Sequence, residues 1–91
     1  MRVKKVKLGE YFMLTEDRYL VDFTCGEVYE LNLLGYEVIV MLRDGMEMKD
    51  IVKSISAKYS VPVERVEEDV VNFLKMLEEE GIAEVVWNEH Q

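Results

Sequence analysis

The sequence predicts an α+β fold in which a three-stranded antiparallel sheet is followed by three helices. Short aromatic and β-branched runs separated by turn residues fill the first third of the chain. In the remainder, apolar residues recur at spacings of three and four, which is the period of a helix that buries one face. At 91 residues the chain can bury one modest core, so we expect a single domain of residues 1–91.

Three strands are expected before residue 32. The apolar, aromatic-rich runs 11–14 and 19–23 flank the polar residues 15–18, which is the pattern of a hairpin. Gly26 tolerates the positive φ of a second turn and leads into residues 27–31. The β-branched, aromatic and apolar side chains of that last run favour a half-buried strand.

The three helices begin and end at recognisable residues. Asn32 is placed to cap a helix over 33–43, because its side-chain oxygen can accept hydrogen bonds from the first free N–H groups. Helical spacing of apolar residues continues over 46–58. Pro62 then breaks the pattern at a point where a third helix over 63–80 can begin, since the first turn of a helix needs no N–H there.

The two ends of the chain carry weaker signals. Residues 82–87 favour a short terminal strand. Four of the eleven basic residues crowd into an N-terminal arm, at Arg2, Lys4, Lys5 and Lys7. A solvated strand flank is the favoured interpretation of this arm, and contact with an acidic partner is the alternative. The run Glu78 to Glu80 similarly indicates a solvated helix end rather than a calcium site.

Several short motifs follow one another in a distinctive order. Gly-Glu-Val-Tyr-Glu-Leu-Asn over 26–32 ends the third strand, Asp44-Gly45 ends the first helix, and the third helix holds Glu64, Glu67, Asp69-Val70, Phe73-Leu74 and Leu77 before Gly81-Ile82. In this order the chain resembles the PqqD-like family, also called RiPP recognition elements, over residues 11–83, which the resemblance marks as the core of the domain. The family is described as winged-helix-like, and three strands followed by three helices are the content of a winged helix-turn-helix.

Composition argues against several function classes. The formal net charge of −8 disfavours nucleic acid as a partner, because phosphate binding requires clustered Lys and Arg. His90 is the only histidine and Cys25 the only cysteine, so neither a histidine-based catalytic group nor a zinc site can be assembled. We therefore expect no enzymatic activity, no metal and no cofactor.

The hydropathy pattern bears on location. No apolar run approaches the length of a membrane span. The basic start is followed by Gly9 and Glu10 rather than by the apolar core of a signal peptide. The sequence therefore predicts a cytoplasmic protein with no membrane partner.

The strand over 27–31 is expected at the edge of its sheet, where an extended peptide can satisfy its unpaired N–H and C=O groups by adding a further strand. The family resemblance implies this use. It implies binding of the leader region of a ribosomally synthesised precursor peptide between the third strand and the third helix, and presentation of that peptide to maturation enzymes. Carried onto this chain, the peptide-binding positions are Glu27, Val28, Tyr29, Glu30, Leu31, Val66, Asp69, Val70, Phe73, Met76 and Leu77.

Two departures from the family pattern bear on the subtype. The chain lacks the Trp-Asp and Arg-rich N-terminal pattern that is associated with quinone-cofactor synthesis, and it carries no fused catalytic domain. The resemblance therefore favours a free-standing leader-binding protein of the lasso-peptide type, which serves a separate leader peptidase. A cyclase or a radical SAM enzyme stays open as the partner.

Other interpretations stay open as well. A stripe at helical spacing is more often plain core than a ligand surface, and this applies to Val66, Val70, Phe73 and Leu77. Three acidic residues separate the core interpretation from the ligand interpretation better, because they would be free to contact a basic or polar peptide residue, namely Asp69, Glu27 and Glu30. The alternative function is an acidic winged-helix protein–protein interaction or regulatory module without a leader ligand. The same edge strand could also pair two copies as a homodimer.

Overall fold

The computed structural model describes residues 1–88 of the chain. The elements in order are β1 (Val3–Leu8), β2 (Phe12–Leu14), β3 (Tyr19–Asp22), β4 (Glu27–Glu30), α1 (Leu33–Arg43), α2 (Met48–Tyr59), α3 (Val63–Glu79) and β5 (Ala83–Trp87). The predicted three-stranded antiparallel sheet followed by three helices is confirmed, and each predicted helix boundary lies within two residues of the observed one. The winged-helix resemblance stays a prediction.

Local chemistry explains where the helices begin and end. The side chain of Asn32 accepts a hydrogen bond from the N–H of Gly35 at 2.8 Å and so caps α1, as predicted. α2 ends at Ser60, whose φ of 54° is left-handed, and Pro62 occupies the N-cap position of α3. Gly81 has a φ of 75°, which lets the chain turn sharply from α3 into β5.

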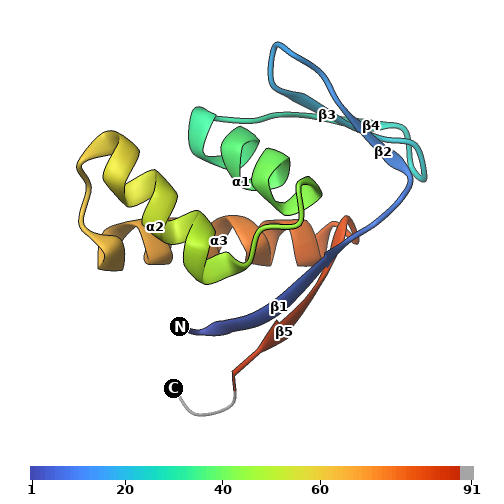
Figure 1. The fold of residues 1–91 in the computed structure, drawn as a ribbon. Coiled ribbons are helices and arrows are strands. Elements are labelled where there is room, and N and C mark those ends of the chain that lie inside the picture. The colour runs from blue at the N-terminus through green and yellow to red at the C-terminus, as the bar shows by residue number, and fades with distance from the viewer. Residues whose placement is uncertain (89–91) are drawn as a thin grey trace.

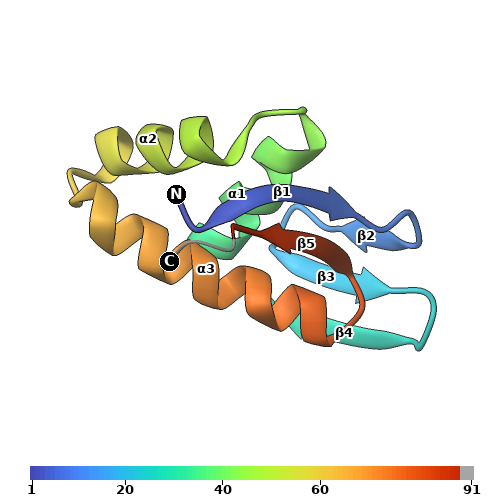
Figure 2. The same cartoon turned by 90° about the horizontal axis from the view of Figure 1, so that it is seen from below.

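The strands form two sheets rather than one. β2, β3 and β4 pair in sequence order, whereas β1 pairs antiparallel with β5 in a separate two-stranded sheet. Figure 2 shows β1 and β5 side by side, with β5 next to α3. The N-terminal arm is therefore not a plain solvated flank. Its lysines are exposed, but Val3, between Arg2 and Lys4, is only 4% exposed and belongs to the core.

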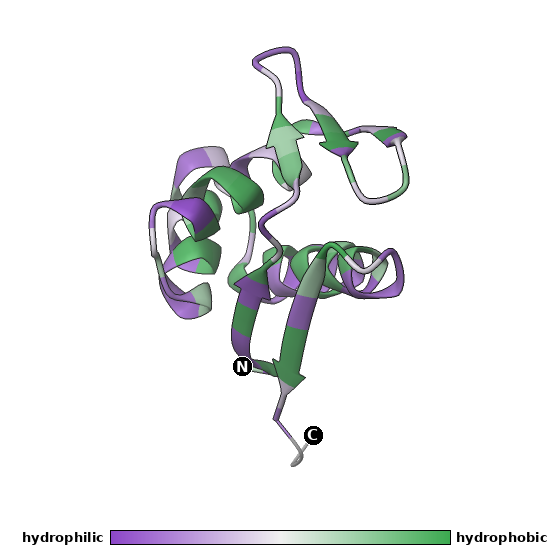
Figure 3. Ribbon diagram, turned by 90° about the vertical axis from the view of Figure 1, so that its right-hand side faces the viewer, coloured by the Kyte–Doolittle hydropathy of each residue, from purple (hydrophilic) through white to green (hydrophobic). Residues whose placement is uncertain are grey.

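The core lies between the helices and the inner faces of the two sheets. Each helix contributes fully buried side chains, including Ile39 of α1, Ile51 of α2 and Leu74 of α3, and Leu20 of β3 joins them. Figure 1 shows the three-stranded sheet set beside α1, on the far side of the molecule from β1 and β5. In Figure 3 apolar (green) and polar (purple) residues alternate along β1 and β5, and both kinds occur on the helices. No helix within residues 1–88 is long and apolar enough to cross a membrane.

A partly buried ion pair joins α1 to α2, in which the side chain of Lys58 is 58% exposed. The carboxylate of Glu37, which is 9% exposed, accepts hydrogen bonds from Lys58 Nζ at 2.6 Å and from the hydroxyl of Tyr59 at 2.9 Å. The hydrogen bond to Glu37, followed by the charge of Glu37, raises the pKa of Lys58. Such a pair fixes how two helices meet more than it adds net stability, because burying the carboxylate has its own cost.

Candidate functional site

β4 is an edge strand with one row of unpaired backbone groups. Leu31 donates its N–H to the carbonyl of Arg18 at 2.8 Å. In an antiparallel pair, residues alternate between those whose backbone groups bond to the partner strand and those whose backbone groups point away from it, so this bond shows which residues of β4 bond to β3. The backbone N–H and C=O groups of the odd-numbered residues of β4 therefore bond to β3. The even-numbered residues, Val28 and Glu30, point their N–H and C=O groups away from the sheet, where no described strand pairs with them.

The turn before β4 is held by one buried carboxylate. Asp22, which is 4% exposed, accepts hydrogen bonds from the N–H of Thr24 at 2.9 Å, from the hydroxyl of Thr24 at 2.6 Å and from the thiol of Cys25 at 3.3 Å. The hydrogen bonds from Thr24 hold the pKa of Asp22 below its ordinary value. Cys25 is thus an exposed turn residue, and Asp22 determines where β4 begins.

Tyr29 ties β4 to the end of α3. Its hydroxyl lies 2.9 Å from Glu27 Oε2 and 2.9 Å from Glu80 Oε2, and its single proton can be donated to one carboxylate at a time. Burial, then the hydrogen bonds to Glu80 and Glu27, raises the pKa of Tyr29, so the phenol stays neutral. The sequence did not point to Glu80, because the run 78–80 has the composition of a solvated helix end.

α3 presents two neighbouring stripes of side chains. Val66, Val70 and Leu77 point into the core and are at most 2% exposed. The second stripe follows helical spacing and stays accessible, with Asp69 and Glu80 exposed and Phe73 and Met76 half-buried. Glu80 shares this helical spacing, but spacing alone does not show that its carboxylate contacts Tyr29.

The ring of Phe73 packs against the start of α1. A Cβ placed on Gly35 would lie 2.8 Å and 3.0 Å from two atoms of this ring, so an alanine there would force the ring to move. Phe73 therefore meets the chain a few residues after β4 ends, and Glu80 meets it at Tyr29 within β4. The two positions are about 10 Å apart along the helix axis, so the segment from Tyr29 to Gly35 runs alongside the second half of α3.

We call this region the β4–α3 seam. It comprises β4, with its free edge, and the accessible α3 side chains Asp69, Phe73, Met76 and Glu80. Of the predicted peptide-binding residues, the structure brings seven to accessible positions in the seam: Glu27, Val28, Tyr29, Glu30, Asp69, Phe73 and Met76. It places four others in the core, where they support the seam from beneath and contact no ligand without repacking: Leu31, Val66, Val70 and Leu77.

The other side of the three-stranded sheet is unusually apolar. Met13 pairs with Val21 and Val21 with Val28, so their side chains share one face. Large side chains on this outer sheet face are 36–68% exposed, namely Tyr11, Met13, Tyr19, Phe23 and Val28. These exposed apolar side chains make the outer sheet face a candidate contact surface.

Metal chemistry finds no support in the described part of the chain. No group of three or more His, Cys, Asp or Glu residues that could hold a metal ion occurs within residues 1–88. His90, the histidine considered from the sequence, lies outside the described residues. The seam therefore offers backbone hydrogen bonds, apolar contacts and negative charge.

Comparisons with known proteins give one family and two similar structures. The family model "Coenzyme PQQ synthesis protein D (PqqD)" matches residues 10–83. The solved structure "Lasso peptide synthetase B1 complexed with the leader peptide" is similar with a TM-score of 0.78 and 24% identity, over 89% of this chain and 99% of that chain. "TbiB1 in Complex with the TbiA(beta) Leader Peptide" is similar with a TM-score of 0.71 and 27% identity, over 92% of this chain and 95% of that chain. No curated protein matches this chain significantly.

Proposed function

This chain belongs to the PqqD family, and we propose that it binds the leader region of a ribosomally synthesised precursor peptide by adding the peptide as a strand to β4. The observation that carries the proposal is the unpaired edge of β4 beside an accessible stripe of α3. The two similar structures support it, because each is described as a complex with a leader peptide.

Backbone pairing supplies affinity that depends little on the peptide sequence. Val28 and Glu30 each offer one N–H and one C=O to a strand laid along the edge. Every such bond replaces bonds to water, so each adds only about 1 kcal/mol. Selectivity for one leader must therefore come from side chains of the seam.

The seam favours a leader with an apolar centre and basic flanks. Phe73 and Met76 offer an aromatic ring and a flexible thioether to an apolar anchor. Asp69 stands beyond them at one end of the seam, and Glu27 and Glu80 stand at the other. Carboxylates in these places attract Lys or Arg of the peptide and repel acidic residues.

Presentation to a maturation enzyme is the second half of the proposal. A peptide strand added to β4 projects alternate side chains onto the side of the sheet that carries Val28. The outer sheet face then becomes a combined surface of protein and peptide. We place the maturation enzyme there, whether it is a leader peptidase, a cyclase or a radical SAM enzyme, while this chain itself has no catalytic role.

An amide chemical-shift titration tests leader binding. The ¹⁵N-labelled chain is titrated with a leader peptide from a short precursor that is encoded beside its gene, and with a scrambled peptide of the same composition. We expect saturable shifts over residues 27–31 and 69–80 with the leader alone. We also expect slower hydrogen exchange at the amides of Val28 and Glu30, because only strand addition gives both N–H groups a partner. Absence of saturable shifts at both places would contradict leader binding.

The alternative is a protein–protein module without a leader ligand, and homodimer formation through β4 is its simplest form. Antiparallel self-pairing would bring Glu27 and Glu30 of one copy close to the same residues of the other. Repulsion between these carboxylates favours a peptide over a second copy. A concentration-dependent mass in sedimentation that is insensitive to the leader peptide would support the alternative instead.

The remaining sequence predictions are part of this proposal. They are a cytoplasmic location, one domain over residues 1–91 with its core at 11–83, and a winged-helix-like arrangement of the three helices. The free-standing, lasso-peptide-type role belongs with them, and it is supported by the description of one similar structure as a lasso peptide synthetase B1.

A further inference from the structure

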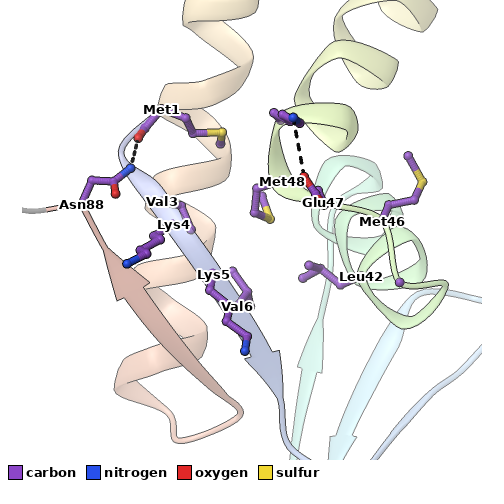
Figure 4. Close-up of a pocket in the computed structure, with 12 residues that line it drawn as sticks. Met1, Val3, Lys4, Lys5, Val6, Leu42, Met46, Glu47, Met48 and Asn88 are labelled. Carbon is purple, nitrogen blue, oxygen red and sulfur yellow. Dashed lines mark hydrogen bonds and ion pairs between the residues drawn. The ribbon is translucent and has the colours of Figure 1, made fainter.

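A cleft separates β1 from the turn that joins α1 to α2. Its volume is about 650 Å³, and none of its lining residues belongs to the β4–α3 seam. Figure 4 shows Leu42 and Met48 on one side of this cleft and the side chains of β1 on the other. The proposed leader binding does not use this cleft.

One wall of the cleft is a second unpaired strand edge. Gly9 donates its N–H to the carbonyl of Ile82 at 2.7 Å, which fixes the alternation of the β1–β5 ladder. The backbone N–H and C=O groups of the odd-numbered residues near this end of β1 therefore bond to β5. Val6 points its N–H and C=O away from β5, and it lines the cleft. No described strand pairs with β1 on this side.

The facing wall is apolar and adaptable. Leu42 and Met46 are half-buried, and Met48 is 6% exposed. Val3, at 4% exposure, lies at the base of β1 on the opposite wall. Methionine side chains fit different apolar partners because they are unbranched and flexible. This wall suits apolar side chains of a partner segment without fixing one shape.

The rim of the cleft is basic, although the chain is strongly acidic. Its lining contains three lysines, Lys4, Lys5 and Lys49, and one acidic residue, Glu47. The formal charge of the lining is therefore +2, whereas that of the whole chain is −8. Lys49 and Glu47 lie 3.8 Å apart, but both side chains are at least 65% exposed, so this ion pair holds Lys49 only weakly.

We propose that this cleft binds an extended segment of a partner protein in which acidic and apolar side chains alternate. The segment pairs with the free edge of β1, its apolar side chains face Leu42, Met46 and Met48, and its carboxylates face the lysines. The stretch from Val3 to Val6 spans about 13 Å, which corresponds to about four residues of the bound segment. The leader peptide has the opposite chemistry, because the acidic seam selects basic flanks.

A matched pair of synthetic peptides tests this proposal. The probes are acetyl-Leu-Glu-Leu-Glu-Leu-Glu-amide and its counterpart with Lys in place of Glu, each titrated into the ¹⁵N-labelled full chain. We expect saturable shifts at Val3, Val6 and Met46 to Lys49 with the Glu peptide only. Raising NaCl from about 0.05 to about 0.5 M should weaken this binding at least about fivefold, because the charges involved are exposed.

Charge reversals locate the binding on the protein. We expect each of the variants Lys5→Glu and Lys49→Glu to lower the affinity for the Glu peptide at least about fivefold. Lys75→Glu, an exposed position on α3 that does not line the cleft, should change the affinity less than about twofold. Far-UV circular dichroism confirms that each variant is folded.

Three results would overturn the proposal. They are absence of saturable shifts up to about 1 mM Glu peptide, equal binding of the Lys peptide, and equal losses in all three variants. Shifts that appear on concentrating the protein alone would instead assign the cleft to a second copy of this chain. Leader binding is read at different residues, so either proposal can fail while the other stands.

Discussion

β4 and β1 each leave one edge unpaired, yet the side chains around the two edges carry opposite charge. Glu27, Glu80 and Asp69 accompany β4, whereas Lys5 and Lys49 accompany β1. The backbone groups that the two edges offer are the same, so backbone pairing cannot tell one extended peptide from another. The flanking side chains must therefore distinguish one peptide from another, by attracting one charge and repelling the other.

The two edges also differ in what lies behind them. β4 belongs to a sheet whose outer face is apolar and exposed, so a strand added there lies beside a second binding surface. β1 belongs to a two-stranded sheet whose partner strand β5 packs on α3. A segment added to β1 therefore lies against the apolar wall of the cleft, at the turn between α1 and α2, rather than beside an exposed sheet face. One edge suits presentation of a substrate, and the other suits attachment to a partner.

A proline substitution at the free edge of β4 should have the largest effect on leader binding. Val28→Pro removes the outward N–H of β4 without removing a bond to β3, because Val28 does not pair with β3 through that group. We expect leader affinity to fall at least about 30-fold, since a hydrogen bond is lost and the proline ring blocks the edge. Binding of the acidic probe at β1 should be unchanged. Isothermal titration calorimetry with both peptides measures the two affinities.

The reciprocal variant places a proline at the free edge of β1. Val6→Pro should abolish binding of the acidic probe and leave leader affinity unchanged, because Val6 holds the corresponding place on β1. Val28→Ala is the matched control, since it shortens the side chain but keeps the N–H, and it should cost leader affinity about threefold or less. Equal losses in Val28→Pro and Val28→Ala would show that the side chain, not strand addition, carries leader binding.

Gly35→Ala should have the next largest effect, again on one edge only. The new Cβ would lie 2.8 Å from the ring of Phe73, so the ring must move within the seam. Crowding of this kind costs about 1–3 kcal/mol of unfolding free energy, and we expect leader affinity to fall about tenfold. Urea unfolding and calorimetry measure both quantities. Adding Phe73→Leu to Gly35→Ala should restore part of the stability, and strict additivity of the two changes would refute the clash.

Local signals in the sequence were sufficient for the helices but not for the second sheet. Asn32 and its spacing to the apolar residues of α1 predicted that helix to the residue. The β1–β5 pairing joins the two ends of the chain, and no local pattern reports such a contact. The alternation within β1 is also broken by an irregularity between Val3 and Lys5, so its inward residues do not follow the period of a strand.

The site was predictable as a region but not as a set of contacts. The resemblance located β4 and α3, and the two-residue period of a strand places the side chains of Leu31 and Val28 on opposite faces. Helical spacing alone could not separate the buried stripe of Val66 and Val70 from the neighbouring stripe of Phe73, because which stripe is covered depends on the packing of α1 and α2. Glu80 was missed for the same reason, since its bond to Tyr29 is a tertiary contact.

Acid should loosen the turn before β4 and spare β1. Hydrogen bonds hold the pKa of Asp22 below its ordinary value of 3.8, so the stability they contribute is present above pH 3.8 and is lost as pH falls through the lower, folded-state value. Asp22→Asn should therefore destabilise the protein at neutral pH and converge with the unsubstituted protein below pH 3.8. Urea unfolding at several pH values measures this. Glu16→Gln in the neighbouring turn is the control, and a parallel trend there would remove Asp22 as the cause.

Tyr29→Phe should have the smallest effect and is the most specific test of the acidic end of the seam. The ring remains, so the apolar packing of β4 against α3 is preserved, but Glu27 and Glu80 lose the hydroxyl proton that they share in turn. Both carboxylates are then free to contact a basic residue of the leader. We expect leader affinity to stay within about threefold while its decline with added salt becomes steeper, because more of the binding is then ionic. An unchanged salt dependence would show that the leader does not reach this end of the seam, and that its selectivity comes from Phe73, Met76 and Asp69 alone.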